Sequence, residues 1–295
     1  MNNEFQNITE IRNKEFMNEK TIAITGATDG IGFEIARELA SSGARVLMIG
    51  RNHQKGQLAL NRIREVSPDS NVRFLKGDLS IQREVRLLAQ IINRTESRLD
   101  VLINNAGGIF YQRTESEDGH EMTFALNHLA YFLLTELLIP MLRKAPEGRI
   151  INTSSGAHFN TSMNFQDIKA LHNYNGWSAY QRSKLANILF TRKLAQKLRI
   201  SRITVNAFHP GFVRTNFAVN NNFIDRIRFR TAMHFSGIPA KEGAKTGIML
   251  ASHPSVSDST GGYFVKGRLT NPSAEAQSET IASQLWELSE TYVKL

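Results

Sequence analysis

A short apolar run that leads directly into a glycine-rich turn constrains the fold of this chain more than any other feature. Residues 21–25 (Thr-Ile-Ala-Ile-Thr) are apolar and β-branched, which predicts a buried strand. They lead into residues 26–32 (Gly-Ala-Thr-Asp-Gly-Ile-Gly), and a helical pattern follows through about Ser42 and ends at Gly43. A strand, a glycine turn and a helix in this order predict the first unit of a parallel α/β sheet.

The rest of the chain alternates strand and helix signals. Strands are predicted at 45–49, 72–76, 101–103, 149–153, 204–208 and 262–265, and helices at 53–66, 81–94, 119–143, 179–198 and 279–292. Repeated units of this kind favour a doubly wound parallel sheet covered on both faces, the Rossmann arrangement. We predict one such α/β domain at 20–295, after a polar extension at 1–19. Residues 212–239 break the alternation and are predicted to form a lid over the site.

Composition excludes several kinds of chemistry. The 295 residues include no cysteine, so disulfides, thiolate nucleophiles and cysteine metal sites are ruled out, and no other cluster suggests a metal. The net charge of +9 permits nucleic acid as a partner, but without a basic run or known motif we expect a basic surface and no nucleic-acid binding. The polar first twenty residues show no secretory signal, and the apolar stretch 130–142 is short for a membrane span. We expect a cytoplasmic protein without a transmembrane segment.

The glycine turn is where a dinucleotide phosphate would sit. Glycine lets the backbone approach the phosphates closely, and the following helix supplies free N–H groups and a positive dipole end. The spacing here is Thr-Gly-x-x-x-Gly-x-Gly rather than Gly-x-Gly-x-x-Gly. A glycine-rich turn alone also serves ordinary tight turns, so its position between strand and helix is what favours a nucleotide site.

The end of the second strand indicates which dinucleotide is preferred. Enzymes selective for NAD place a carboxylate there to bind the ribose 2′-hydroxyl. This chain has Gly50 and Arg51, and a guanidinium can pair with a 2′-phosphate, which favours NADP(H). The alternative is that Arg51 is a solvated loop residue. Asp78, after the third strand, is a candidate for binding the adenine amino group or for capping the next helix.

Tyr180 and Lys184 are spaced four residues apart within a helical pattern, so they share a face and can point into one site. A free tyrosine has a pKa of about 10. A nearby ammonium favours the phenolate and is expected to lower that pKa toward neutrality. The pair would then serve as a general acid or base for interconverting a carbonyl and an alcohol.

Polar residues at other strand ends support this interpretation. Ser155 lies in the Asn-Thr-Ser-Ser run that closes the strand at 149–153, where it could hold a substrate oxygen or cap the following turn. Residues 104–107 (Asn-Asn-Ala-Gly) follow the fourth strand. Asn127 falls in the middle of a predicted helix, where asparagine is locally unfavourable and a special role is expected.

With these motifs in this order, the chain resembles the short-chain dehydrogenase/reductase superfamily from Thr21 to the C-terminus. The matching motifs are Thr25-Gly26-Ala27-Thr28-Asp29-Gly30-Ile31-Gly32, Asp78, Asn104-Asn105-Ala106-Gly107, Asn127, Ser155, Tyr180 with Lys184, and Pro210-Gly211. Finer strings, such as Asn127-His128-Leu129, His209-Pro210-Gly211 and Leu285-Trp286-Glu287, are similar to the retinol dehydrogenase and WW-domain oxidoreductase branch.

The resemblance implies a role for each matching residue. Ser155 would orient and polarise the substrate carbonyl, Tyr180 would transfer the proton, Lys184 would bind the nicotinamide ribose and Asn127 would hold a proton-relaying water. The residues implied to bind NADP(H) are Gly26, Thr28, Asp29, Gly30, Ile31, Gly32, Arg51, Asp78, Leu79, Asn105, Ala106, Gly107, Tyr180, Lys184, Pro210, Gly211, Val213 and Thr215. Asp29 departs from the basic residue of many NADP-preferring relatives, so the NADP prediction depends mainly on Arg51.

The predicted lid indicates the type of substrate. Five phenylalanines lie in or near it, which suits a lipophilic carbonyl or alcohol such as a retinoid, a steroid, a fatty aldehyde or a secondary-metabolite ketone. Its arginines leave peripheral contact with a membrane open. We predict an NADP-dependent oxidoreductase, with a catalytically silent NADPH-binding redox sensor as the alternative. The helices at 119–143 and 179–198 could join copies into a homodimer or homotetramer.

Overall fold

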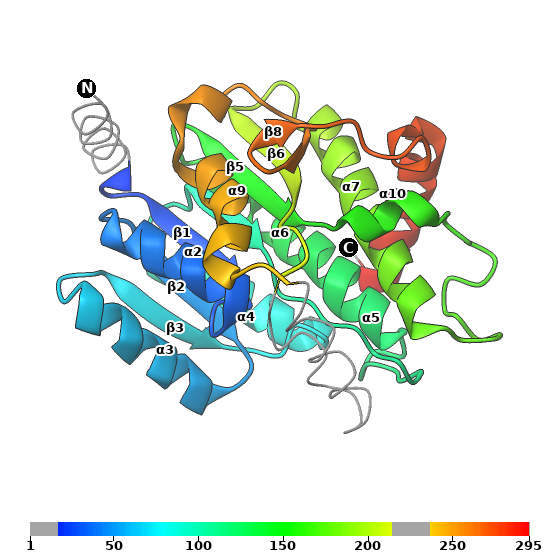
Figure 1. Cartoon of the computed structure of the whole chain (residues 1–295), viewed down its shortest axis with the longest axis horizontal. Helices are drawn as coiled ribbons and strands as arrows, with labels where there is room; N and C mark the ends of the chain where they lie inside the picture. Colours follow the sequence, from blue (N-terminus) through cyan, green and yellow to red (C-terminus); the bar gives the residue numbers. More distant parts are fainter. Residues whose placement is uncertain (1–16, 214–236, 295) are drawn as a thin grey trace.

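One mixed sheet forms the centre of the molecule in the computed structural model, which describes residues 17–213 and 237–294 (Figure 1). Its strands, in spatial order, are β3 (Val72–Lys76), β2 (Arg45–Gly50), β1 (Thr21–Thr25), β4 (Val101–Asn104), β5 (Gly148–Thr153), β6 (Ile203–His209), β7 (Tyr263–Val265) and β8 (Arg268–Leu269). Neighbouring strands are parallel except for the last pair, β7 and β8. The order reverses direction between β1 and β4, which confirms the doubly wound prediction.

Helices cover both faces of the sheet. On one face lie α2 (Gly30–Ser41), α3 (His53–Val66) and α9 (Ala240–Ser252), and on the other lie α4 (Gln82–Thr95), α6 (Ala130–Leu142), α7 (Gly176–Lys197) and α10 (Glu279–Val293). The strands are buried on both sides because successive side chains point to opposite faces. In β1, Ile22 and Ile24 join the core beneath α2, whereas Ala23 joins the core beneath α6 and α7.

The predicted helix at 119–143 is more irregular than its sequence pattern indicated. Gly119 lies in a turn with a φ of +76°, and helical structure starts only with the single turn α5 (Met122–Phe124). The π-helical turn η1 (Ala125–Leu129) follows and leads into α6. The predicted bounds were therefore wrong at the start of this helix, and the wide turn was not anticipated.

In the described part of the chain, one α-helix and one strand lie where none was predicted. Residues 240–252 form α9, and β8 follows β7 across a tight turn in which Lys266 and Gly267 both have positive φ, of 50° and 74°. Paired positive φ values are typical of two-residue hairpins, and glycine supplies one of them without steric cost. The helix predicted at 179–198 begins three residues earlier, at Gly176.

By length and composition alone, the helical stretch Met122–Leu142, which extends beyond the apolar stretch 130–142, would reach across a membrane. It is the one such candidate in the described part of the chain. However, 72% of its apolar window is buried inside the fold, where α4 and β5 cover it, as is usual for a core helix.

The C-terminal helix α10 covers part of α6 and α7. Trp286 of α10 packs against Phe132 and Phe190, with ring centroids 4.8 and 6.0 Å apart. Next to it, His128 Nε2 lies 2.8 Å from Ser289 Oγ. The chain's own last helix therefore occupies part of the surface on which a second subunit was expected to pack.

Candidate active site

A cavity of about 450 Å³ opens where the parallel strands end. This is the edge at which doubly wound sheets bind their ligands, because the loops there diverge from the point where the strand order reverses. Of the residues singled out in the sequence, those that line the cavity are Gly26, Thr28, Asp29, Gly30, Ile31, Arg51, Asp78, Leu79, Asn105, Ala106, Gly107, Ser155, Tyr180, Lys184, Pro210, Gly211 and Val213. Gly32 and Asn127 lie behind the wall, and Thr215 lies outside the described residues.

The turn after β1 needs its glycines. Gly26 and Gly30 have positive φ values of 64° and 57°, which other residues adopt only under strain. A β-carbon on Gly26 would also lie 2.8 Å from Ala106 Cα, and one on Gly32 would meet the Gly26 carbonyl oxygen. The Asp29 carboxylate accepts a 2.7 Å hydrogen bond from the Gly30 amide as the N-cap of α2. This turn, the glycine cradle (residues 26–32), leaves backbone N–H groups uncovered at the N-terminus of α2, which suits a diphosphate.

Asn105 fastens the loop after β4 to this turn. The Thr25 hydroxyl accepts hydrogen bonds from the amides of Asn105 and Ala106, at 2.8 and 2.9 Å. In return, Asn105 Nδ2 donates to the Thr25 carbonyl at 3.0 Å. The floor of the cavity is thus held rigidly between two strands.

The far end of the cavity carries positive charge. Arg51, after β2, and Lys55, in the first turn of α3, both line it. Asn52 caps this helix, with its side chain accepting from the Lys55 amide at 2.9 Å. Lys55 was missed in the sequence, although a second cation four residues after Arg51 is a signal that could have found it.

Asp78 lines the same end of the cavity and also has a structural task. Its Oδ1 accepts hydrogen bonds from the amide and the hydroxyl of Ser80, at 3.0 and 2.7 Å. Its own amide donates to Glu84, at 2.6 Å. The Asp78 carboxylate therefore stabilises the turn between β3 and α4, and Asp78 also lines the cavity.

Ser155, Tyr180 and Lys184 all line the cavity. The helical spacing brings Tyr180 and Lys184 to one face of α7, where Lys184 Nζ lies 5.7 Å from the centre of the Tyr180 ring. Ser155 follows β5 and caps the short helix η2 (Gly156–Asn160) through a 3.2 Å bond from the Ala157 amide. Its side chain is also hydrogen-bonded to the Tyr180 side chain.

Burial sets the protonation of this pair. It raises the pKa of Tyr180 to about 12, with the hydrogen bond to Ser155 acting in the opposite direction. It lowers the pKa of Lys184 to about 7. The expected net lowering of the Tyr180 pKa was therefore wrong, because the same low-dielectric surroundings disfavour the phenolate and weaken the charge of its cationic neighbour.

The Asn127 side chain holds the loop after β4 against α7. It is fully buried in the π-helical turn, where its Oδ1 accepts from the Gly108 amide at 2.8 Å. Its Nδ2 donates to the Gly108 carbonyl at 3.0 Å and to Ser183 Oγ at 2.9 Å. The Asn127 side chain thus joins the loop after β4 to Ser183 of α7, the residue that precedes Lys184. Wide helical turns of this kind are frequent at functional sites.

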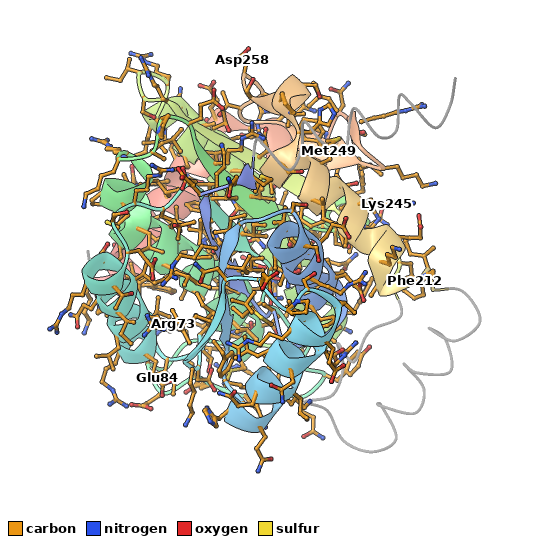
Figure 2. The ribbon with its side chains drawn as sticks, turned by 90° about the vertical axis from the view of Figure 1, so that its left-hand side faces the viewer. Arg73, Glu84, Phe212, Lys245, Met249 and Asp258 are labelled. Carbon is orange, nitrogen blue, oxygen red and sulfur yellow. The ribbon has the colours of Figure 1, made fainter. Side chains whose placement is uncertain are left out.

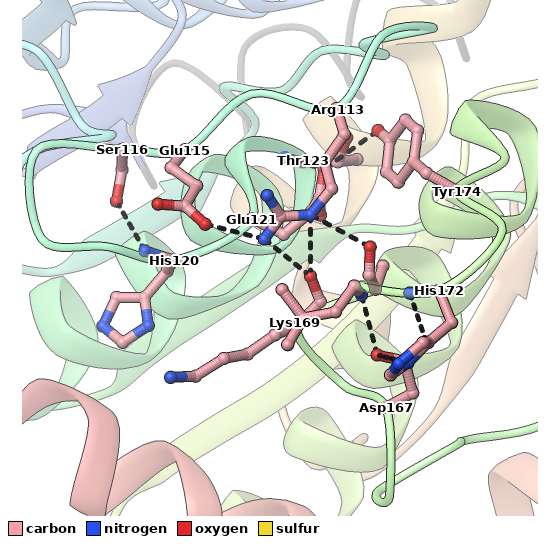
Figure 3. Close-up of polar contacts among 12 residues, drawn as sticks. Arg113, Glu115, Ser116, His120, Glu121, Thr123, Asp167, Lys169, His172 and Tyr174 are labelled. Carbon is pink, nitrogen blue, oxygen red and sulfur yellow. Dashed lines mark hydrogen bonds and ion pairs between the residues drawn. The ribbon is translucent and has the colours of Figure 1, made fainter.

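Polar contacts next to Phe110, which lines the cavity, fix two loops against each other (Figure 3). The Tyr174 hydroxyl donates to the Phe110 carbonyl at 2.6 Å and lies 3.0 Å from Glu121. Glu121 in turn caps α5, with its carboxylate accepting from the amides of Thr123 and Phe124. Arg113 extends the contact, donating to the Ala170 carbonyl at 3.0 Å and pairing with Glu115 at 2.7 Å.

Apolar side chains form the walls near Tyr180. Those that line the cavity are Ile109, Phe110, Met122, Leu126, Trp177, Phe212 and Val213. Trp177 and Phe212 are 47% and 48% exposed, and Figure 2 shows Phe212 near the N-terminal part of α9. Ile238 donates its amide to the Phe212 carbonyl at 2.7 Å, at the base of the predicted lid. The lid's central residues, 214–236, lie outside the described part of the chain.

His158 and Phe159 follow the Ser155 turn, but neither residue lines the cavity. His158 is fully buried, and both of its nitrogens have partners. Nδ1 lies 2.7 Å from the Ser155 carbonyl oxygen, and Nε2 accepts from the Ser273 amide at 3.1 Å. His158 therefore shapes the site from behind.

The family model for short chain dehydrogenase matches residues 20–223. Among curated proteins, retinol dehydrogenase 14 of Mus musculus is 39% identical over 289 residues, with 94% of this chain and 86% of the relative covered. Retinol dehydrogenase 11 of Homo sapiens is 37% identical over 270 residues, with 92% and 84% covered.

Solved structures agree with the family model. An uncharacterised protein from Mycobacterium paratuberculosis aligns with a TM-score of 0.77 and 32% identity, covering 94% of both chains. A short-chain dehydrogenase from Escherichia coli complexed with NADPH aligns with a TM-score of 0.67 and 26% identity, covering 86% of this chain and 99% of the other. The chain thus belongs to the short-chain dehydrogenase family, in its retinol dehydrogenase-like branch, and is an oxidoreductase of alcohol and carbonyl groups.

Proposed function

We propose that this protein reduces the carbonyl group of a lipophilic substrate with NADPH and catalyses the reverse oxidation of the alcohol. The observation that carries the proposal is one cavity lined by the glycine turn after β1, by Arg51 and Lys55 after β2, and by Ser155, Tyr180 and Lys184. A dinucleotide and a carbonyl compound are the two ligands whose chemistry these residues fit.

The residues present suit an NADP(H) molecule. Because β-carbons at Gly26 and Gly32 would fill the cradle, the bare backbone there is the feature a diphosphate requires. Arg51 and Lys55 supply the positive charge that a ribose 2′-phosphate needs. The E. coli relative solved with NADPH supports the same choice.

The chain's own groups are suited to move a proton to or from the substrate oxygen. The cofactor, when bound, supplies the hydride. Ser155 donates a hydrogen bond to the substrate carbonyl, and Tyr180 donates its proton to the oxygen as negative charge develops there. With a raised pKa, Tyr180 holds this proton at neutral pH. Lys184 stabilises the phenolate left behind, and Asn127 keeps the surrounding loop and helix in register.

The walls of the cavity favour an apolar substrate. Ile109, Phe110, Met122, Leu126 and Trp177 surround the space beside Tyr180, and such walls with few polar groups bind lipophilic molecules. The names of the curated relatives, retinol dehydrogenases, agree with a long apolar alcohol or aldehyde.

A substrate panel tests the proposal. Purified protein would be mixed with NADPH and retinaldehyde, a long-chain aldehyde, a steroid ketone or pyruvate, and NADPH absorbance would be followed. We expect consumption with apolar carbonyl compounds and none with pyruvate. Turnover of pyruvate alone, or NADPH binding with no turnover of any carbonyl in the panel, would contradict the proposal.

A further inference from the structure

His209 is a polar group of the cavity that the proposed mechanism does not use. It is the last residue of β6, it is partly exposed, and it lines the cavity between the Ser155 turn and Pro210. Its ring lies over Gly156, where a β-carbon would come within 3.4 Å of His209 Nε2. The imidazole therefore stands beside the turn that carries Ser155.

The hydrogen bonds around His209 determine its tautomer. The Gly211 amide donates to Nδ1 at 3.4 Å, and because an amide can only donate, Nδ1 carries no proton. Burial and the neighbouring His158 lower the pKa of His209 to about 4, so the ring is neutral at pH 7. A neutral ring with a bare Nδ1 carries its proton on Nε2. Among the described residues, no hydrogen-bond acceptor is found for that N–H group.

The neighbouring histidine shows the contrast. His158 uses both ring nitrogens on protein groups, Ser155 and Ser273, and lies outside the cavity. Within residues 17–213 and 237–294, His209 uses one nitrogen and has no partner for the other, and the residue lines the cavity. Of this pair, His209 is the one available to a ligand.

The reacting oxygen does not require this donor. A carbonyl oxygen has two lone pairs, and the hydroxyl groups of Ser155 and Tyr180 occupy both in the mechanism proposed above. We propose that His209 donates from Nε2 to a second oxygen of the substrate, so that the preferred substrate is a lipophilic carbonyl compound with a further keto, hydroxyl or ester group near the reacting carbon. This inference rests on the proposed function and narrows its substrate class.

A donor at His209 predicts that the enzyme discriminates between substrates with and without a second oxygen. A substrate that covers His209 without offering an acceptor leaves a desolvated N–H group unpaired, which is unfavourable. A substrate with an oxygen at this point satisfies it. We therefore expect the wild-type enzyme to prefer an oxygen-bearing substrate over its plain analogue by about tenfold in kcat/KM.

Two isosteric variants separate the nitrogens of the ring. His209→Gln keeps a donor near the position of Nε2, whereas His209→Asn keeps an acceptor near Nδ1 for the Gly211 amide and places no donor at the position of Nε2. The probes are a long-chain methyl ketone and the diketones of the same length, with the second carbonyl moved one carbon at a time. Each protein is assayed with NADPH, and NADPH binding is titrated by fluorescence.

We expect the Asn variant to lose about tenfold in kcat/KM on the best diketone, mainly through KM, and to lose nothing on the methyl ketone, which no longer leaves the Nε2 donor unpaired. The Gln variant should retain the preference and the wild-type pH profile, because a neutral imidazole transfers no proton. NADPH affinity should be unchanged in both variants.

Three results would overturn the inference. One is a wild-type enzyme that turns over all the probes without preferring any diketone, and this result does not depend on whether the variants fold. Another is an Asn variant that loses equally on both kinds of probe, which would make His209 a purely structural residue. Absence of turnover of every probe would instead overturn the proposed function, and the inference with it.

Discussion

Lys184 Nζ donates a 3.1 Å hydrogen bond to the carbonyl oxygen of Thr153, the last residue of β5. The bond fixes the lysine of α7 to the carboxyl end of β5, beside the cavity and one helical turn from Tyr180. Burial moves the pKa values of the two side chains in opposite directions from their ordinary values, upward for Tyr180 and downward for Lys184. The following predictions depend on this arrangement and on the cradle around it.

Replacing Tyr180 with phenylalanine should abolish most turnover without affecting NADPH binding. The ring and its 5.5 Å contact with Trp177 remain, whereas the proton donor is lost. We expect a fall in kcat of about a thousandfold, measured by NADPH consumption. Tyr292→Phe, on the partly buried tyrosine that stacks on His120, is the matched control and should keep full activity. A redox sensor that only holds NADPH would show an unchanged output in both variants.

Removing the cations after β2 should weaken NADPH binding selectively. Arg51→Ala and Lys55→Ala each delete a positive charge at the cavity end expected to hold the 2′-phosphate. A charge-assisted hydrogen bond of this kind implies about tenfold weaker NADPH binding for each variant, with NADH binding unaffected. Fluorescence titration with both cofactors measures this, and Arg73→Ala, which removes an exposed arginine of β3, is the control. Equal losses for NADPH and NADH would refute the selectivity.

Gly32→Ala should damage both the fold and the cofactor site. Its new β-carbon would collide with the Gly26 carbonyl and come within 2.5 Å of Asn105 Nδ2, neither of which can move without disturbing β1 and β4. Thermal melts and NADPH titration should both show large losses. Gly119→Ala separates this clash from backbone strain, because Gly119 has a φ of +76° with nothing within 4 Å of the added carbon. It should cost only about 1 kcal/mol of stability.

Stability should depend on pH through Lys184. Its pKa is lowered from 10.5 to about 7 on folding, so between these values the unfolded chain binds more protons than the folded one. This contribution to stability therefore rises with pH across that window and is least favourable below about 7. Lys184→Met should remove this dependence and raise the melting temperature most at acidic pH, while Asn187 still donates to the Thr153 carbonyl at 3.1 Å.

Lys76→Met is the control for the Lys184 prediction, since Lys76 is exposed on β3. Its melting temperature should follow that of the wild type at every pH. A Lys184→Met protein whose pH dependence also matches the wild type would show that the buried ammonium carries no such penalty.

Local patterns were sufficient to predict the centre of the fold. Residues 21–25 form β1 as predicted, because a continuous apolar, β-branched run suits a strand buried on both faces. The spacing of Tyr180 and Lys184 likewise places both on the cavity side of α7. These predictions needed only periodicity and the rule that ligands bind at the carboxyl ends of parallel strands.

Predictions that depended on packing were less successful. Gly243 and Gly247 weaken the helical signal of 240–252, yet both are needed where α9 lies close to its neighbours. A β-carbon on Gly243 would be 2.6 Å from Val213, and one on Gly247 would be 2.8 Å from Ile35. Similarly, the direction of the Tyr180 pKa shift depends on burial, which spacing alone does not reveal.

The wide turn at Ala125–Leu129 has a consequence for how this enzyme can change. A π turn holds one more residue than an α turn in nearly the same rotation, so deleting one residue there would leave a regular helix with both sides in phase. Met122 and Leu126 would still face the cavity, and α6 would stay anchored in the core. The deletion would instead act on Asn127, whose hydrogen bonds to Gly108 and Ser183 are made from this wide turn.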